Sequence, residues 1–155
     1  MKRLKIITDM EHLTKPCEAI SFKDSLAVAK QMKMFLLTNK NIERDTIGLA
    51  CNQLGLPGRV ILYRDGGSFK HLINPQITYQ SDDVITTKEG CLSVPNKSVY
   101  VTRSKDITIY SEINGPKYKE YGYGWESNYS EIYSLIIQHE IDHLNGITLI
   151  QKEGK

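Results

Sequence analysis

The chain has 155 residues and a mass of 17.7 kDa, a length that suits one domain with its own hydrophobic core. Its 20 Lys and Arg residues nearly balance its 18 Asp and Glu residues, and the net charge of +2 argues against a dedicated nucleic-acid-binding protein. The apolar runs are too short to span a membrane, and acidic residues interrupt the basic start before a signal peptide could form. We therefore expect a single domain over residues 1–155.

The chain contains three cysteines, which are Cys17, Cys51 and Cys91. An odd number without close pairing does not indicate a disulfide framework. A reducing cytoplasm is the simpler interpretation, and it leaves a thiol available for chemistry.

An amphipathic helix is predicted after an irregular first stretch that reaches about Ile20. Ser21 and Asp24 form a start that is similar to a capping box. Apolar residues then recur at helical spacing until Asn39 and Asn41 indicate an end. The residues on this apolar face are Phe22, Leu26, Ala29, Met32 and Leu36.

The middle of the chain is predicted to form short antiparallel strands, because turn residues separate short β-prone runs. The turns are Leu56-Pro57-Gly58, Asp65-Gly66-Gly67, Asn74-Pro75 and Asn114-Gly115-Pro116. The expected strands are Ile47–Ala50, Arg59–Tyr63, Phe69–Ile73, Ile77–Tyr79, Val99–Arg103 and Asp106–Tyr110.

The segment Tyr118–Tyr133 is rich in tyrosine and holds the only Trp. It is interpreted as a strand end, a turn and the start of a helix. An aromatic surface that binds a partner is the alternative.

The last predicted element is a second amphipathic helix, with Asn128 or Ser130 as its cap and Asn145-Gly146 at its end. The residues that share one face of this helix are Ile132, Leu135, Ile136, His139 and His143.

The sequence H-E-x-x-H, from His139 to His143, predicts a metal site on this helix. Residues four apart lie one turn apart on the same face, so both imidazoles can reach one ion. Glu140 can then take a proton from a metal-activated water. The alternative is a pair of half-buried histidines that the helix dipole favours. A catalytic site needs a third ligand, and the candidates are His12, His71, the carboxylates and the three thiols.

Two other segments carry candidate residues. In Glu89-Gly90-Cys91-Leu92-Ser93, the Cys lies where a strand ends, and it is either a ligand or a small buried apolar residue. In Thr46–Gln53, small residues allow an extended ligand to lie against the backbone, and Gln53 can donate to an oxyanion. The alternative for this second segment is a tightly packed inner strand.

Together these segments resemble the peptide deformylase family, whose motifs read G-φ-G-φ-A-A-x-Q, E-G-C-L-S and Q-H-E-x-D-H, where φ is apolar. This sequence has TIGLACNQ, EGCLS and QHEIDH in the same order. The resemblance covers about residues 44 to 150. It implies an α+β fold, with antiparallel sheets packed around a C-terminal metal-bearing helix and one further N-terminal helix.

The resemblance also implies an activity, namely metal-dependent hydrolysis of the N-formyl group from N-formylmethionine at the start of nascent polypeptides, with release of formate. The implied ligands of the metal are Cys91, His139 and His143. The ion is typically Fe²⁺, and Zn²⁺, Ni²⁺ or Co²⁺ can replace it. Glu140 is the implied general base, and Gln53 with the backbone N–H of Leu92 would stabilise the oxyanion.

The resemblance assigns the remaining site residues as well. Gly48 and Gly90 would bond the peptide backbone, and Glu89, Arg103 and Asp142 would support the site. The methionine side chain would be bound by Ile47, Ile132, Leu135 and Ile136.

The sequence departs from the family pattern at Thr46, which replaces Gly, and at Cys51, which replaces Ala. Thr46 costs room beside the expected cleft, whereas Cys51 is small enough to substitute structurally or to act as an oxidation-sensitive thiol. We expect the final QKEGK not to form the further helix with which bacterial members dock on the ribosome. The chain thus looks like the short forms that phages encode, and formylated nascent peptides stay the expected partner.

Two alternatives remain at this point. H-E-x-x-H alone favours a zinc endopeptidase. A non-catalytic protein with a closed structural metal site is the other, and it would need a fourth ligand near Cys91.

Overall fold

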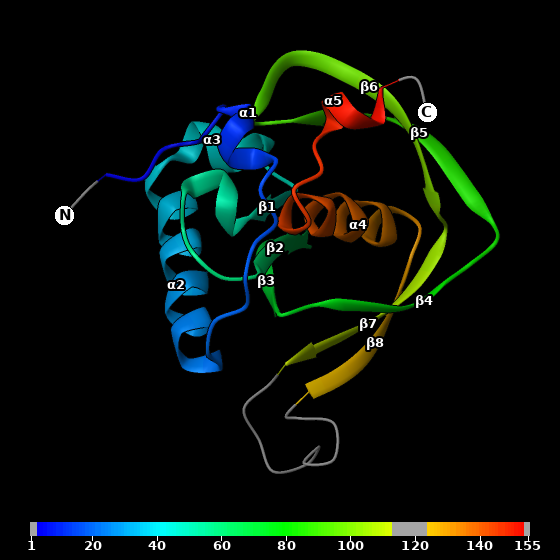
Figure 1. The fold of residues 1–155 in the computed structure, drawn as a ribbon, viewed down its shortest axis with the longest axis horizontal. Coiled ribbons are helices and arrows are strands. Elements are labelled where there is room, and N and C mark those ends of the chain that lie inside the picture. The colour runs from blue at the N-terminus through cyan, green and yellow to red at the C-terminus, as the bar shows by residue number, and fades with distance from the viewer. Residues whose placement is uncertain (1–2, 113–123, 154–155) are drawn as a thin grey trace.

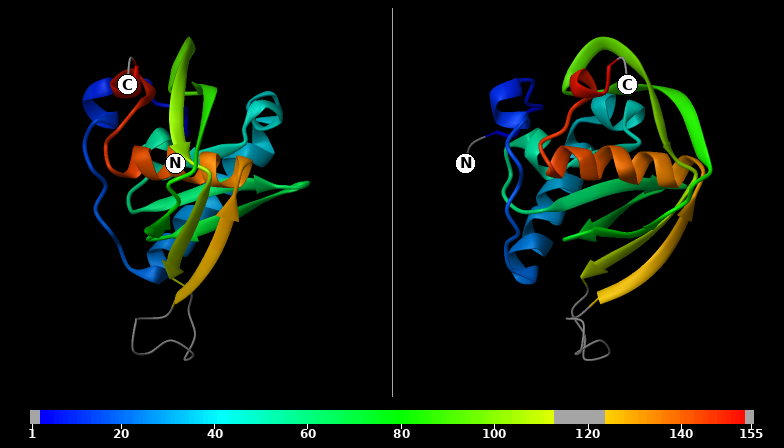
Figure 2. Two further views of the ribbon diagram at one scale, coloured as in Figure 1. Left: turned by 90° about the vertical axis from the view of Figure 1, so that its right-hand side faces the viewer. Right: turned by 45° about the vertical axis from the view of Figure 1, so that its right-hand side comes forward.

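The C-terminal helix α4 (Ile132–Leu144) lies in the middle of the molecule, with antiparallel strands around it (Figures 1 and 2). The computed structural model describes residues 3–112 and 124–153. Besides α4, the helices of the described residues are α1 (Met10–Leu13), α2 (Phe22–Thr38), α3 (Lys40–Asp45), the 3₁₀ helix η1 (Cys51–Leu54) and α5 (Leu149–Lys152). In the described part of the chain, no helix is both long enough and apolar enough to cross a membrane.

The predicted N-terminal helix is confirmed as α2. The Ser21 hydroxyl accepts a hydrogen bond from the Asp24 N–H at 3.1 Å, and the helix ends at Asn39. Its buried residues include Met32 and Leu36, and they pack against β2 and β3. A second helix, α3, follows Asn39 at once and was not predicted.

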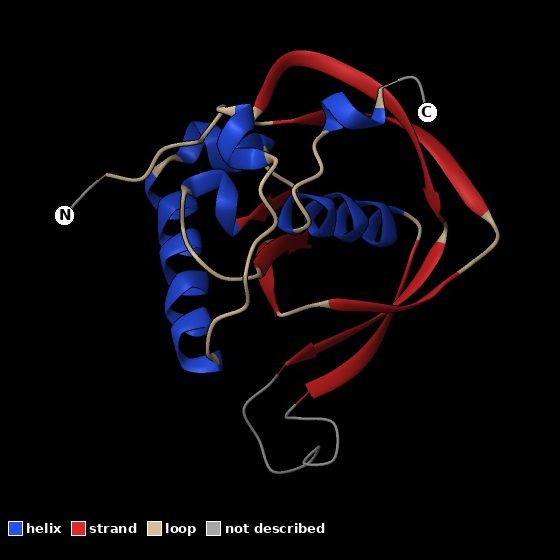
Figure 3. Cartoon of the chain, viewed as in Figure 1, coloured by secondary structure: helices blue, strands red, loops and turns tan. Residues whose placement is uncertain are grey.

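The strands form three antiparallel groups, as Figure 3 shows in red. The first is β1 (Gly48–Ala50), β2 (Val60–Asp65) and β3 (Ser68–Ile73), in that order. The second is β4 (Gln76–Gln80), β7 (Asp106–Glu112) and β8 (Gly124–Ser130). The third is the long hairpin of β5 (Val84–Cys91) and β6 (Val94–Ser104), which arches over one end of α4. The expected α+β class and the antiparallel pairing are confirmed.

Strand β5 was not predicted as a strand, and β6 starts earlier than expected. Residues of β5 alternate between exposed and half-buried positions, so the strand has no buried apolar face to reveal it. The expected strand end at Cys91 is confirmed, because the turn between β5 and β6 begins at Leu92.

The start of α4 differs from the prediction. Asn128 and Ser130 belong to β8, and neither caps the helix. Glu131, with a φ of 55°, turns the chain directly from β8 into α4 without a side-chain cap. The predicted end is confirmed, since Gly146 follows the last turn with a φ of 75°.

The prediction for the N-terminal end of the fold is wrong in part. The first stretch is not wholly irregular, because the Asp9 carboxylate accepts from the Glu11 N–H and starts α1. At the C-terminal end, Gln151 and Lys152 lie in the one-turn helix α5, where the Gln151 side chain accepts from the Thr148 N–H. The expectation that QKEGK forms no further docking helix stays a prediction. The predicted turn at Asn114-Gly115-Pro116 and residues 118–123 of the tyrosine-rich segment lie outside the described residues. Of its other tyrosines, Tyr129 and Tyr133 pack edge-on against Tyr63.

Candidate metal centre

Three side chains from two elements meet at one end of the central helix. Cys91 closes β5, where the pairing register with β6 shifts between Gly90 and Cys91. His139 and His143 lie one turn apart on α4, with ring centroids 5.0 Å apart. The ligand atoms of the three residues all lie within 4.8 Å of one another, and Cys91 Sγ is 3.3 Å from His143 Nε2.

The third ligand that the sequence left open is therefore Cys91. The other histidines lie elsewhere, because His12 contacts the carbonyl of Asn52 and His71 contacts Lys33. One thiol and two imidazoles suit a divalent ion such as Fe²⁺ or Zn²⁺, and three protein ligands leave a position open for water. Burial lowers the pKa of His143 to about 3, so this imidazole is neutral, the form that binds a metal.

The Glu89 carboxylate fixes the orientation of the His139 ring. Its Nδ1 lies 2.8 Å from Oε1 of Glu89, which leaves Nε2 to face Cys91 and His143. Burial alone would raise the pKa of Glu89, but hydrogen bonds from His139 and Arg103 lower it to about 2.

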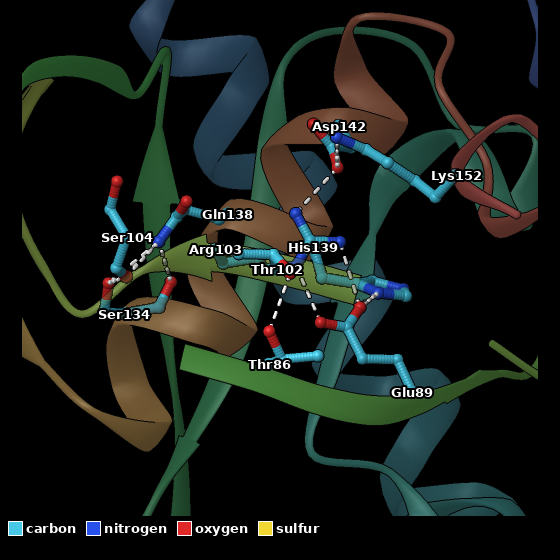
Figure 4. A network of polar contacts seen from close by, with 10 residues as sticks. All are labelled: Thr86, Glu89, Thr102, Arg103, Ser104, Ser134, Gln138, His139, Asp142 and Lys152. Atoms are coloured by element: carbon cyan, nitrogen blue, oxygen red, sulfur yellow. Dashed lines mark hydrogen bonds and ion pairs between the residues drawn. The ribbon is translucent and has the colours of Figure 1, made fainter. Parts of the chain in front are cut away.

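Arg103 connects this carboxylate to α4 (Figure 4). Its guanidinium donates to both oxygens of Glu89, at 2.7 and 2.9 Å, and to Asp142 Oδ2 at 2.8 Å. Only 4% of its side chain is exposed. Glu89, Arg103 and Asp142 thus form one ion-pair network that joins β5, β6 and α4 behind the ligands.

Glu140, which follows His139 on α4, lines a cleft beside the ligands. It is 3% exposed, and its Oε1 has no hydrogen-bond partner among the described residues. Burial raises the pKa of Glu140 to about 7. A buried carboxyl whose pKa is close to neutral pH, and which has one oxygen without a hydrogen-bond partner, can exchange a proton with a ligand in the cleft.

Gln53 also points toward the ligands, although it lies in η1 and not at the end of the expected strand. Its Oε1 accepts from the Ala50 N–H at 2.9 Å, which fixes the orientation of the amide. Its Nε2 lies 3.1 Å from Ser93 Oγ and 3.5 Å from Cys91 Sγ. The amide N–H donors therefore face the metal centre.

The centre opens into a cleft of about 700 Å³. One wall is the start of β1, a second is the end of β5 with Leu92, and the floor is α4. Strand β1 is the edge of its sheet, as β2 is its paired neighbour. All the residues expected to contact the substrate line this cleft, namely Ile47, Gly48, Gly90, Ile132, Leu135 and Ile136.

Cys51, one departure from the family pattern, is fully buried in the core. Its thiol donates to the Gly58 carbonyl at 3.1 Å. A hydrogen bond with Cys17 and burial together raise the pKa of the Cys51 thiol, which keeps it protonated. The geometry thus favours the structural interpretation of Cys51 over an oxidation-sensitive thiol.

Sequence reasoning missed two polar residues that hold the site together. Ser93 is buried and accepts from Gln53, and its place in the EGCLS segment was the available signal. Asn52 is buried and donates to the His143 carbonyl at 2.8 Å, which ties η1 to α4. No sequence pattern pointed to Asn52.

Comparisons with known proteins agree on one family. The family described as polypeptide deformylase matches residues 3–154. A peptide deformylase of Pseudothermotoga lettingae is 37% identical over 107 residues, which cover 68% of this chain and 58% of the relative. The chain thus spans less than two thirds of that relative's length.

Two solved structures, named as a peptide deformylase and a probable peptide deformylase, share the fold of this chain. A peptide deformylase from Thermotoga maritima superposes with a TM-score of 0.81 at 25% identity, and the match covers 100% of both chains. A probable peptide deformylase from Synechococcus phage S-SSM7 superposes with a TM-score of 0.75 at 28% identity, over 97% of this chain and 99% of the other.

Proposed function

The chain belongs to the peptide deformylase family, and we propose that it hydrolyses the N-formyl group of N-formylmethionine at the start of nascent polypeptides. One observation carries the proposal. The Glu140 carboxyl, whose Oε1 has no hydrogen-bond partner among the described residues, lies beside the group of Cys91, His139 and His143 at the floor of an open cleft. A hydrolase needs this combination of a metal group, a proton acceptor and access for a substrate.

Cys91, His139 and His143 would hold the metal ion, and Glu89 and Arg103 would keep His139 in its orientation. When bound, the ion supplies Lewis-acid activation of water and of the formyl group. Fe²⁺ is the proposed ion, because a thiolate with two imidazoles suits it, and Zn²⁺, Ni²⁺ or Co²⁺ would substitute.

Glu140 would accept the proton of the attacking water and return it to the leaving amine. Its raised pKa supports both steps, because a carboxyl with a pKa near neutral pH can both take up and release a proton. Gln53 Nε2 and the Leu92 N–H would donate to the formyl oxygen as it becomes an oxyanion. The products are formate and a peptide with a free N-terminal methionine.

The peptide would lie as an added strand between the free edge of β1 and the end of β5. Gly48 and Gly90 would provide backbone hydrogen bonds from these two walls. The methionine side chain would enter the apolar part of the cleft, which Ile132, Leu135 and Ile136 line on α4 and Ile47 lines just before β1.

The two alternatives find less support. A closed structural centre would need a fourth ligand, and among the described residues the ligand group consists of Cys91, His139 and His143. A zinc endopeptidase would share the helix motif, but it would not explain why a thiol is the third ligand or why the whole fold follows that of the deformylases.

Several wider expectations belong to the same proposal. We propose one catalytic domain over residues 1–155, a cytoplasmic location and no binding of nucleic acid. A short, phage-like form is supported by the match to the phage protein, but the Thermotoga maritima protein matches over its full length as well. Docking on the ribosome has no support in the described residues.

The test is formate release from a short formyl-Met peptide by protein loaded anaerobically with Fe²⁺ or Ni²⁺. Release that a chelator abolishes is the expected result, while an internal peptide bond in an unformylated peptide should stay intact. The matched variant is Glu140→Ala, which should lose turnover and keep about one metal ion per chain. Metal-loaded, folded wild-type protein that releases no formate would overturn the proposal.

A further inference from the structure

Thr46, the other departure from the family pattern, lies at the junction of α3 and β1. It is 2% exposed, and it also lines the cleft. Its hydroxyl donates to the Ile42 carbonyl at 2.6 Å, and its N–H donates to the Glu43 carbonyl at 3.1 Å. Thr46 thus ends α3 with a side-chain bond, and the chain continues at once into the wall of the cleft.

A second residue holds the same junction from β2. The Arg64 guanidinium donates to the Thr46 carbonyl at 3.1 Å, and it reaches the Glu43 carbonyl at 2.6 Å and the Glu43 carboxylate at 3.0 Å. The Arg64 N–H donates to the Ile47 carbonyl at 2.8 Å. Contacts from two sides therefore leave the backbone of residues 43–47 little freedom to move.

The position of this junction matters because β1 is three residues long and touches the proposed base. Gly48 comes two residues after Thr46, and its backbone packs directly on the Glu140 side chain. The edge of β1 that faces the cleft is the one to which a peptide would pair. A shift at Thr46 would therefore move the edge that binds the peptide before it affected the ligands on α4 and β5.

We propose that Thr46 is a positioning residue for the peptide: its hydroxyl fixes the α3–β1 junction so that the free edge of β1 is held ready to pair with the substrate backbone. The inference rests on the proposed function, since it names what the cleft wall binds. A glycine at this position has no hydroxyl, and its backbone loses more conformational entropy when it is held in place. The loss of Thr46 should therefore weaken peptide binding more than it slows the chemical step.

The experiment compares Thr46→Val, which keeps the shape but loses the hydroxyl, with Thr46→Ser, which keeps the hydroxyl. The matched control is Thr38→Val, because the Thr38 hydroxyl makes the same bond to the carbonyl four residues earlier, at 2.9 Å, at the end of α2 and outside the cleft. Three quantities are measured on Ni²⁺-loaded protein: the Kd of the product peptide Met-Ala-Ser, and KM and kcat for its formylated form.

Thr46→Val should raise both Kd and KM by about three- to tenfold, the factor that one hydrogen bond is worth, and change kcat by less than about twofold. Thr46→Ser and Thr38→Val should stay within about twofold of the wild type in all three quantities. Hydrogen exchange should quicken at the amides of residues 46–48 in Thr46→Val and stay unchanged in Thr38→Val.

Equal effects of Thr46→Val and Thr38→Val on Kd would overturn the inference, as would a loss in kcat alone. If Thr46→Val does not fold, Thr46→Gly takes its place, and unchanged peptide affinity in that variant has the same meaning. The Kd does not depend on turnover. Wild-type protein that binds Met-Ala-Ser but releases no formate would therefore contradict the proposed function, while the Kd ratios still decide the role of Thr46.

Discussion

The backbone of Gly48 is pressed against the side chain of Glu140, so that a β-carbon at residue 48 would stand 2.7 Å from Glu140 Oε2. It would also stand 2.9 Å from a methyl group of Ile136. Contacts this short force one of the partners to move. Glycine at this position therefore allows the edge of β1 and the proposed base to lie side by side.

Gly48→Ala should lower kcat/KM by about 10- to 100-fold, because the displaced carboxyl no longer meets the substrate in the required geometry. The control is Gly67→Ala in the β2–β3 turn, where a β-carbon meets nothing within 4 Å. Steady-state kinetics of both variants, with metal content measured alongside, checks the prediction. Equal kinetics of the two variants would show that Glu140 tolerates the movement.

Removal of the Arg103 side chain should destabilise the protein strongly. Arg103→Met leaves the half-buried carboxylates of Glu89 and Asp142 without their shared, buried partner, a loss of about 3 to 5 kcal/mol in the free energy of unfolding. Urea unfolding of the metal-free protein measures it. The double variant Arg103→Met/Glu89→Gln should recover part of the loss, because it removes one unpaired charge. A double variant less stable than the single one would contradict this account.

Glu89 also makes a pH-dependent contribution to the stability of the fold. The pKa of Glu89 is about 2 in the folded protein, below the ordinary value of 4.5, so the folded state favours the ionised form. Its contribution is fully present above the ordinary pKa and is lost as the pH falls toward the folded value. The difference corresponds to about 3 kcal/mol at most.

Unfolding of the metal-free protein between about pH 2 and 6 should therefore show a steeper acid loss in the wild type than in Glu89→Gln. The variant lacks the titrating group, so its free energy of unfolding should vary less across this range. Parallel curves for the two proteins would argue against the network as the source of the acid sensitivity.

Metal binding should become tighter as the pH rises. Burial alone would lower the pKa of His139, but the Glu140 carboxylate and hydrogen bonds with Cys91 and Glu89 raise it to about 10. In the metal-free protein this histidine therefore carries a proton near neutral pH, and an incoming ion must displace it. The apparent Kd for Zn²⁺, measured by chelator competition, should fall by about tenfold or more per pH unit around neutrality. A Kd that does not change with pH would contradict a protonated His139.

Periodicity was enough to predict the two long helices, because α2 and α4 each bury one apolar stripe. The H-E-x-x-H spacing likewise predicted that His139 and His143 face the same ion, since the geometry of one helix decides it. These features depend on local sequence alone.

The third ligand could not be derived in that way. Cys91 lies where the pairing register of β5 and β6 shifts after Gly90, and such a shift depends on the pairing of two strands. The same holds for Gln53, which reaches Cys91 through η1 and a bond to the Ala50 backbone. For both residues the sequence left two interpretations open, and the family resemblance decided between them.

Gln53→Glu tests whether the Gln53 amide donates to the oxyanion. The change keeps the oxygen that accepts from the Ala50 N–H, but it replaces the Nε2 donor, which lies 3.5 Å from Cys91 Sγ, with an acceptor. If Nε2 stabilises the oxyanion, kcat should fall by about 10²- to 10³-fold while the metal content stays near that of the wild type. Ser93→Ala removes only the second contact of Nε2 and should lower kcat far less. A kcat for Gln53→Glu within about threefold of the wild type would leave the Leu92 N–H as the only proposed oxyanion donor.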